Sequence, residues 1–91
     1  MNVYMTTAFS RKIDSDENFA KFMMDSLNRY KKRDWGDLCD EDKKLNDMAM
    51  KHKQGRIVAR YNYTDREDDV YIMATFFNGG AQIEFMFCNE Y

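Results

Sequence analysis

The tripeptide Asn78-Gly79-Gly80 constrains the fold more than any other feature of the sequence. Gly and Asn tolerate the positive φ angles that the tightest hairpin turns need, so this run predicts a β-hairpin. The flanking residues agree with it. Residues 70–77 are apolar on both faces, as in a central strand, and residues 81–88 alternate in polarity. A second alternating segment, residues 57–63, precedes them, so the last third of the chain is expected to form an antiparallel sheet.

The first third predicts a strand and a helix. Residues 3–9 are rich in β-branched and aromatic side chains, which favour a strand. Asp14 and Glu17 have the spacing of a capping box, which predicts a helix start. One helical stripe then follows, formed by Phe19, Phe22, Met23, Leu27 and Tyr30.

A second helix is expected from about residue 38 to residue 52. Gly36 interrupts the first helix, and Asp37 is the candidate N-cap of the second. Trp35 is expected to be structural, with its ring folded over the junction between the helices. The apolar stripe of this helix is thin and consists of Leu38, Leu45, Met48 and Ala49.

These elements predict one α+β domain spanning residues 1–91, in the order β-α-α-β-β-β. The expected architecture is an antiparallel sheet with two helices packed on one face. The expected core is Phe19, Phe22, Met23, Leu27, Tyr30, Leu45, Met48, Ile57, Ala59, Tyr61, Ile72, Ala74, Phe76, Ile83, Phe85 and Phe87.

Composition excludes several classes of protein. Fourteen Lys and Arg face sixteen Asp and Glu, and a net charge of −2 does not suit a general nucleic-acid binder. Two cysteines are too few for a disulfide scaffold and lack zinc-site spacing. No apolar run approaches the ~20 residues that span a bilayer. The sequence therefore predicts a small soluble domain of the cytoplasm without contact to a membrane.

No catalytic constellation stands out. His52 is the sole histidine, and thirteen positions of helix, roughly 20 Å of rise, separate it from Cys39. The phosphate-binding and nucleophile motifs with a known mechanism are missing. We expect a protein that is not an enzyme, with no catalytic residue, cofactor or metal ligand.

Acidic residues form clusters that a cationic partner could recognise. Five carboxylates lie between residues 34 and 42, and helix capping explains most of them. A protein-binding patch or a hard cation are the alternatives for that run. The candidate binding carboxylates are Asp40, Glu41 and Asp42 at this position, and Asp65, Glu67, Asp68 and Asp69 in the turn before the central strand.

The second face of the predicted sheet is more apolar than a solvated face. It is expected to carry Tyr71, Met73, Thr75, Phe77, Met86 and Cys88. Either the N-terminal segment covers this face, or a partner or a second copy of the chain does. We expect Tyr71, Met73, Phe77 and Met86 to contact that partner, while the acidic turn steers a basic partner toward them.

A basic cluster supports a different hypothesis. Arg29, Lys31, Lys32 and Arg33 precede Trp35, which could stack on a nucleic-acid base. A helix C-terminus attracts basic residues in any case, so this weak nucleic-acid-binding domain is the alternative rather than the leading interpretation.

One block of sequence resembles a family of short bacterial proteins encoded by phages, plasmids and conjugative elements. Residues 34–47 contain its Trp-Gly-Asp-x-Cys-x-x-Asp pattern, and Arg56-Ile57, Tyr71-Ile72-Met73 and Glu90-Tyr91 match its later segments. The final hairpin departs from the family, because Phe76-Phe77 and Phe85-Met86-Phe87 replace a polar turn and a Thr/Leu-rich strand.

The resemblance implies no activity for particular residues, but it implies that the protein is encoded on a mobile genetic element. Small acidic proteins of that kind often disarm host defences, as anti-CRISPR proteins do. The expectation is a non-enzymatic inhibitor that binds a host defence protein, such as a CRISPR effector subunit, and occludes a nucleic-acid or assembly site. A phage or plasmid accessory interaction module is the alternative.

Overall fold

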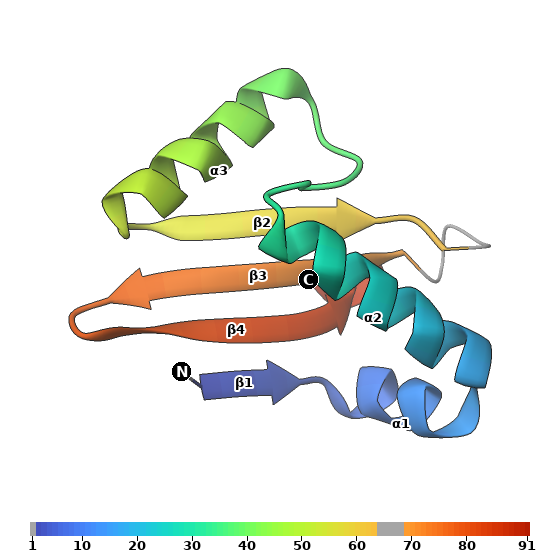
Figure 1. Cartoon of the computed structure of the whole chain (residues 1–91). Helices are drawn as coiled ribbons and strands as arrows, with labels where there is room; N and C mark the ends of the chain where they lie inside the picture. The colour runs from blue at the N-terminus through green and yellow to red at the C-terminus, as the bar shows by residue number, and fades with distance from the viewer. Residues whose placement is uncertain (1, 64–68) are drawn as a thin grey trace.

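The computed structural model describes residues 2–63 and 69–91 as a four-stranded sheet with helices on one face (Figure 1). The elements are β1 (Asn2–Met5), α1 (Thr7–Ser15), α2 (Glu17–Lys31), α3 (Asp40–His52), β2 (Arg56–Tyr61), β3 (Val70–Phe77), β4 (Gly80–Phe87) and a 3-10 turn (Cys88–Glu90). The strand order is β1-β4-β3-β2, with β1 parallel to β4 and the other pairs antiparallel. The α+β class is confirmed, but the described part has three α-helices and a mixed sheet rather than two helices and an antiparallel sheet.

The third helix arises because the first strand is shorter than predicted. The strand ends at Met5, and the side chain of Thr6 caps α1 by accepting a hydrogen bond from the backbone N–H of Phe9. This cap satisfies an amide that has no partner within the helix. Phe9 then lies fully buried in the core, with Ile13 packed against it one turn later. The expected strand over residues 3–9 is therefore wrong beyond Met5.

Helix α2 was predicted correctly, but its start was not. Asp16 is the N-cap, and its side chain accepts from the N–H of Phe19. Asp14 belongs to α1, so the predicted capping box of Asp14 and Glu17 does not form. The stripe Phe19, Met23 and Tyr30 is buried, while Phe22 and Leu27 are half-buried.

Helix α3 presents a different face from the predicted one. It begins at Asp40 after Cys39, and no side chain caps it. Leu45 and Met48, both expected in the core, are 59% and 58% exposed, whereas Asn46 is buried. The amide of Asn46 turns inward because it bonds both backbone groups of Val58, which outweighs the burial of two apolar side chains.

The three predicted strands of the last third are confirmed, and aromatic rings fill the space between sheet and helices. Phe9 of α1 stacks on Phe85 at 5.9 Å between ring centroids, and Phe19 of α2 lies 5.7 Å from Phe87. Among the other predicted core residues of the sheet, Phe76 and Ile83 are half-buried. The rest are buried: Ile57, Ala59, Tyr61, Ile72 and Ala74. The hairpin turn forms at Asn78-Gly79, where only Gly79 has positive φ, so it is not the turn with two positive angles.

Candidate protein-interaction surfaces

The outer edge of β2 is closed by hydrogen bonds to the chain itself. The N–H of Arg60 donates to the carbonyl of Trp35 at 3.0 Å, and the N–H of Asp37 donates to the carbonyl of Arg60 at 2.8 Å. The side chain of Asn46 bonds the N–H and C=O of Val58 at 3.2 and 2.9 Å. The edge clamp, as we call residues 35–37 together with Asn46, leaves no free backbone group at Val58 or Arg60 for another strand.

The edge clamp explains Trp35 and Asp37. Trp35 is 2% exposed, packs edge-on against Tyr30, and donates its indole N–H to Asp47 at 2.9 Å. The prediction that Trp35 is structural is confirmed by this burial. The prediction that Asp37 caps α3 is wrong. Its backbone N–H donates to Arg60, and its carboxylate accepts a hydrogen bond from Asn62.

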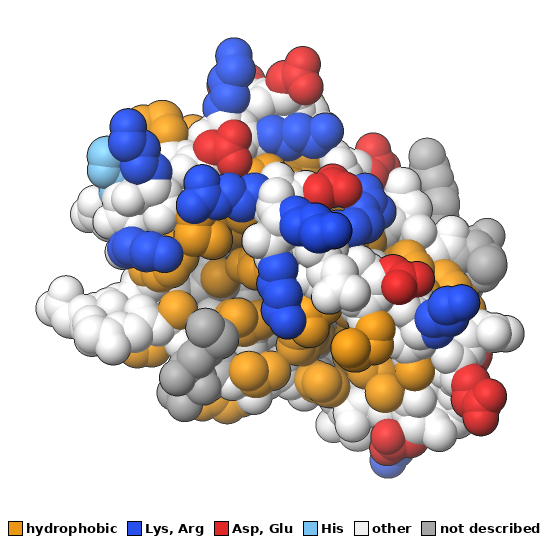
Figure 2. Space-filling view, viewed as in Figure 1, with side chains coloured by type: hydrophobic (Ala, Val, Ile, Leu, Met, Phe, Trp, Pro, Cys, Tyr) orange, Lys and Arg blue, Asp and Glu red, His pale blue; other side chains and the backbone are white. Residues whose placement is uncertain are grey.

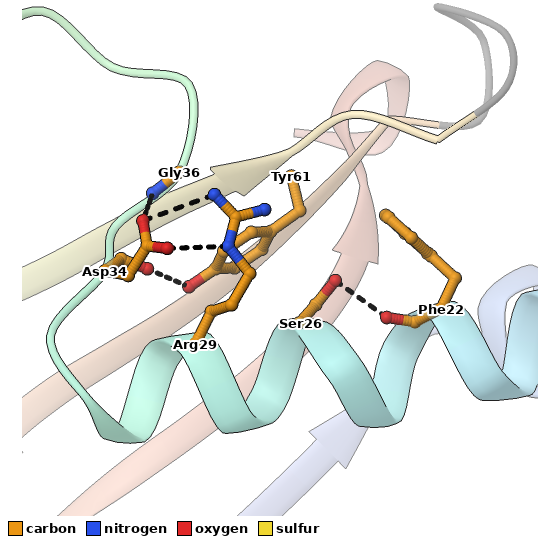
Figure 3. Close-up of polar contacts among 6 residues, drawn as sticks. All are labelled: Phe22, Ser26, Arg29, Asp34, Gly36 and Tyr61. Carbon is orange, nitrogen blue, oxygen red and sulfur yellow. Dashed lines mark hydrogen bonds and ion pairs between the residues drawn. The ribbon is translucent and has the colours of Figure 1, made fainter.

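One of the basic residues at the end of α2, Arg29, is held by contacts within the fold. Figure 3 shows the guanidinium of Arg29 over the ring of Tyr61, 5.1 Å from its centroid, and paired with Asp34 at 2.7 Å. This hydrogen bond raises the pKa of Arg29 and lowers the pKa of Asp34. The hydroxyl of Tyr61 donates to the carbonyl of Asp34. Trp35 is buried and so cannot stack on a nucleic-acid base, while Lys31, Lys32 and Arg33 are exposed.

The sheet face opposite the helices, here called the open face, contains the aromatic residues that the alternation predicted. Phe77 is 51% exposed, and Tyr71 and Met86 are half-buried. Met73, predicted to be an exposed contact residue, is 3% exposed, and that prediction is wrong. It lies in the middle of the face, in register with Val58 and Glu84 on the neighbouring strands.

The last residue of the chain, Tyr91, packs over part of the open face, an arrangement that the sequence analysis did not predict. The ring of Tyr91 packs edge-on against Tyr71 at 5.6 Å, and its hydroxyl accepts from Arg56 at 3.4 Å. Arg56 is in register with Thr75, so these two contacts lie on either side of Met73 along β3. The described part of the N-terminal segment, residues 2–5, forms the edge strand β1 instead of lying across this face.

Two further exposed aromatics on this side were not predicted. Tyr4 is 51% exposed and in register with Glu84, and Tyr91 is 71% exposed. The alternation of Val3, Tyr4 and Met5 could have placed Tyr4 on this face, but the long strand predicted there hid the signal.

The acidic candidates divide into three groups. Asp69 is 3% exposed and pairs with Arg60 at 2.9 Å, a hydrogen bond that raises the pKa of the guanidinium. The carboxylate of Asp69 is therefore engaged within the fold, and the expectation that it is exposed is wrong. Asp65, Glu67 and Asp68 lie outside the described residues. Asp40, Glu41 and Asp42 are exposed in the first turn of α3, where the helix dipole favours them.

Other candidate chemistry stays separated. Cys39 and His52 lie at opposite ends of α3, and burial raises the pKa of the half-buried Cys88. Across residues 2–63 and 69–91, no three His, Cys, Asp or Glu side chains are grouped to hold a metal ion. In the same part of the chain, no helix is both long and apolar enough to span a membrane.

Sequence reasoning also missed an apolar groove of about 270 Å³ on the helix side, where α1, α2, β1 and β4 meet. Figure 2 shows hydrophobic side chains gathered on this face below a region rich in Lys and Arg. Met5, Met24 and Leu27 are among its lining residues, and Met24 is 61% exposed. A second hollow of about 600 Å³ lies between the hairpin and the end of α3, lined in part by Lys53 and Phe76.

No family model, curated protein or solved structure matches this chain.

Proposed function

We propose that this protein is a non-enzymatic inhibitor that binds a host defence protein through its open face. The observation that carries the proposal is the set of exposed rings on one side of the sheet: Tyr4, Phe77 and Tyr91 are each about half exposed or more. Large aromatic side chains offer much contact area at low entropic cost, and they are enriched at the energetic centres of protein interfaces. A solvated sheet face would normally have charged or small polar residues at these positions.

The block at residues 34–47, which resembles the mobile-element family, supports a scaffold role for this part of the chain, because its side chains hold the fold together. Trp35 donates its indole N–H to Asp47, and a Cβ on Gly36 would clash with the carbonyl oxygen of Arg60. The part that resembles the mobile-element family is thus scaffold. Phe77 lies in the hairpin, where the chain departs from that family, and it is the first residue we assign to the binding surface.

The setting follows from the resemblance: an anti-CRISPR-like protein in the bacterial cytoplasm, whose partner is a host defence protein such as a CRISPR effector subunit. Binding there would occlude a nucleic-acid or assembly site. An accessory interaction module of a phage or plasmid would use the same face on a different partner. Nucleic acid is the weaker candidate because the ring expected to stack on a base, Trp35, is buried.

The test is a plasmid-interference assay. A strain with active CRISPR interference is transformed with a targeted plasmid, with and without this protein, and transformants are counted. Wild type is expected to raise the count at least tenfold. Phe77→Ser and Tyr91→Ser should each abolish most of that gain, because both side chains are exposed on the open face. Leu45→Ser, at an equally exposed position on α3, should retain it.

Two results would overturn parts of the proposal. If wild type leaves interference intact in strains with different CRISPR types, the protein is not an inhibitor of this kind. If Phe77→Ser and Tyr91→Ser inhibit as well as Leu45→Ser while all three melt like wild type, the binding surface lies elsewhere. The exposed carboxylates of α3, Asp40, Glu41 and Asp42, are then the next set to change.

A further inference from the structure

The outer edge of β1 has backbone groups that no other part of the described chain uses. β1 is the outermost strand of the sheet (Figure 1) and pairs only with β4. The N–H of Thr6 donates to the carbonyl of Phe85, so the even-numbered residues direct their backbone groups toward β4. Val3 and Met5 therefore direct their N–H and C=O outward. Across residues 2–63 and 69–91, no hydrogen bond reaches these outward groups.

This edge also lacks the usual protection against pairing. Proteins commonly guard an edge strand with Lys, Pro or a bulge. β1 has the sequence Asn-Val-Tyr-Met, without charge or proline. Val3 is 54% exposed and Met5 48%, and both share the helix side with the apolar groove, of which Met5 forms a wall.

We propose that β1 binds β1 of a second copy of the chain in antiparallel fashion, about a two-fold axis at Tyr4. The spacing of the free groups is self-complementary, since Val3 and Met5 lie symmetrically on either side of Tyr4. In this register Val3 stands opposite the partner's Met5, and the pair exchanges two hydrogen bonds. The symmetry produces the same two bonds at Met5, so every outward group of both residues is satisfied.

The side chains fit the same arrangement. Val3 and Met5 lie on the helix side, so in the pair each packs beside the partner's Met5 or Val3 and extends the apolar surface next to the groove. Tyr4 lies on the open face and meets the partner's Tyr4 directly. The two four-stranded sheets become one continuous sheet with both helix layers on the same side. A closed two-fold contact of this kind is the commonest form of oligomer.

The register makes a sharp cross-linking forecast. Residues opposite each other without mutual hydrogen bonds have Cα atoms about 4.5 Å apart, within the range that a disulfide bridges. Tyr4→Cys, in a Cys39→Ser, Cys88→Ser background, should therefore form a symmetric disulfide under mild oxidation. Val3→Cys in that background is the control: the two Val3 positions would be roughly 8 Å apart, too far for a bridge. Non-reducing gels should show a band at twice the 10.9 kDa chain mass for Tyr4→Cys alone.

A second measurement needs no cysteine. Sedimentation velocity of wild type over a concentration series should show a two-chain species. Val3→Pro should raise its dissociation constant at least tenfold, because it removes an outward N–H without breaking a bond to β4. Val3→Thr keeps the backbone and should associate nearly as wild type does.

Three outcomes overturn the inference. One is that wild type stays monomeric up to millimolar concentration. If wild type then binds a different protein and Val3→Pro abolishes that binding, the edge of β1 pairs with a strand of the other protein instead. Another is association that Val3→Pro leaves unchanged, and the third is equal cross-linking at positions 3 and 4. Of the three exposed rings behind the inhibitor proposal, only Tyr4 lies in β1. The variants that test that proposal, Phe77→Ser and Tyr91→Ser, lie outside β1, so its failure and the failure of this inference are distinguishable.

Discussion

The two edges of the sheet are finished in opposite ways. At β2, backbone bonds from Trp35 and Asp37 and the side-chain amide of Asn46 occupy the outward groups of Arg60 and Val58. At β1 the outward groups of Val3 and Met5 meet no other described residue. A free edge is a template for pairing with another chain. The chain therefore closes the edge at β2 with its own residues and leaves the edge at β1 open to the pairing proposed above.

The largest expected effect comes from removing the ring of the closed edge. Trp35→Ala deletes a side chain that is 2% exposed and leaves the carboxylate of Asp47 without its indole donor. We expect the free energy of unfolding to fall by about 3–5 kcal/mol, measured by urea unfolding followed by circular dichroism. Tyr4→Ala is the matched change at the open edge. It should cost under about 1 kcal/mol in dilute solution, since Tyr4 is 51% exposed. Equal losses at the two edges would contradict the comparison.

The next effect tests the amide that completes the edge clamp. Asn46→Ala removes both partners of Val58, and burying an unpaired donor and acceptor should cost about 3 kcal/mol in total. Leu45→Ala, one position earlier and 59% exposed, should change the midpoint of urea unfolding little. The sequence pattern predicts the reverse order, with Leu45 as core and Asn46 as surface. Unfolding of both variants in parallel therefore decides between periodicity and the observed hydrogen bonds.

These two neighbours show how far the sequence could predict the fold. Strong local signals were sufficient for the hairpin at Asn78-Gly79, for β2 and for α2, where alternation or helical spacing runs over many residues. The orientation of α3 was not predictable in this way, because Asn46 is fixed by the backbone of Val58, twelve residues away. Helical periodicity describes only where apolar side chains recur. It does not predict that a polar side chain is buried because hydrogen bonds to an edge strand offset its desolvation.

The candidate surface was predictable only in part. Alternation along β3 placed Tyr71, Met73 and Phe77 on one face correctly, but only Phe77 is widely exposed. Met73 is 3% exposed, and Tyr91 returns from the end of the chain to pack on Tyr71, two residues away along β3. Likewise, Asp69 is buried in an ion pair with Arg60 of the neighbouring strand. Contacts between segments far apart in sequence set these exposures, and no local pattern contains them.

Alkaline pH offers a way to loosen the closed edge without a substitution. Burial raises the pKa of Tyr30, which packs on Trp35, from 10.0 to about 12, and burial also raises the pKa of Tyr61. A raised folded-state pKa means that the stabilisation is complete below pH 10 and is lost as pH rises toward 12. For Tyr30 the loss corresponds to about 2–3 kcal/mol. The emission of Trp35, the single tryptophan, should shift to longer wavelength over this window. A shift already complete below pH 10 would contradict the burial of these rings.

The smallest effect is expected at the ion pair that holds the approach to the edge clamp. Asp34 pairs with Arg29 at 2.7 Å and also accepts a hydrogen bond from the N–H of Gly36, the residue that lies against Arg60. Both charged side chains are about half exposed, so solvent weakens the pair, and Asp34→Asn at pH 7 should cost under about 1 kcal/mol.

The pH dependence of that cost distinguishes the charge of Asp34 from its hydrogen-bonding shape. The hydrogen bond from Arg29 lowers the pKa of Asp34 below 3.8, so its stabilising contribution is present above that pH and fades as the pH falls through the folded-state value. Asn keeps an oxygen for the N–H of Gly36 but has no charge to lose. The difference in unfolding free energy between wild type and Asp34→Asn should therefore shrink between pH 5 and pH 2, and it should shrink at pH 7 when salt is raised. A difference that stays constant across both series would assign the role of Asp34 to its bond with Gly36 alone, and the closed edge would then depend on no charge at this position.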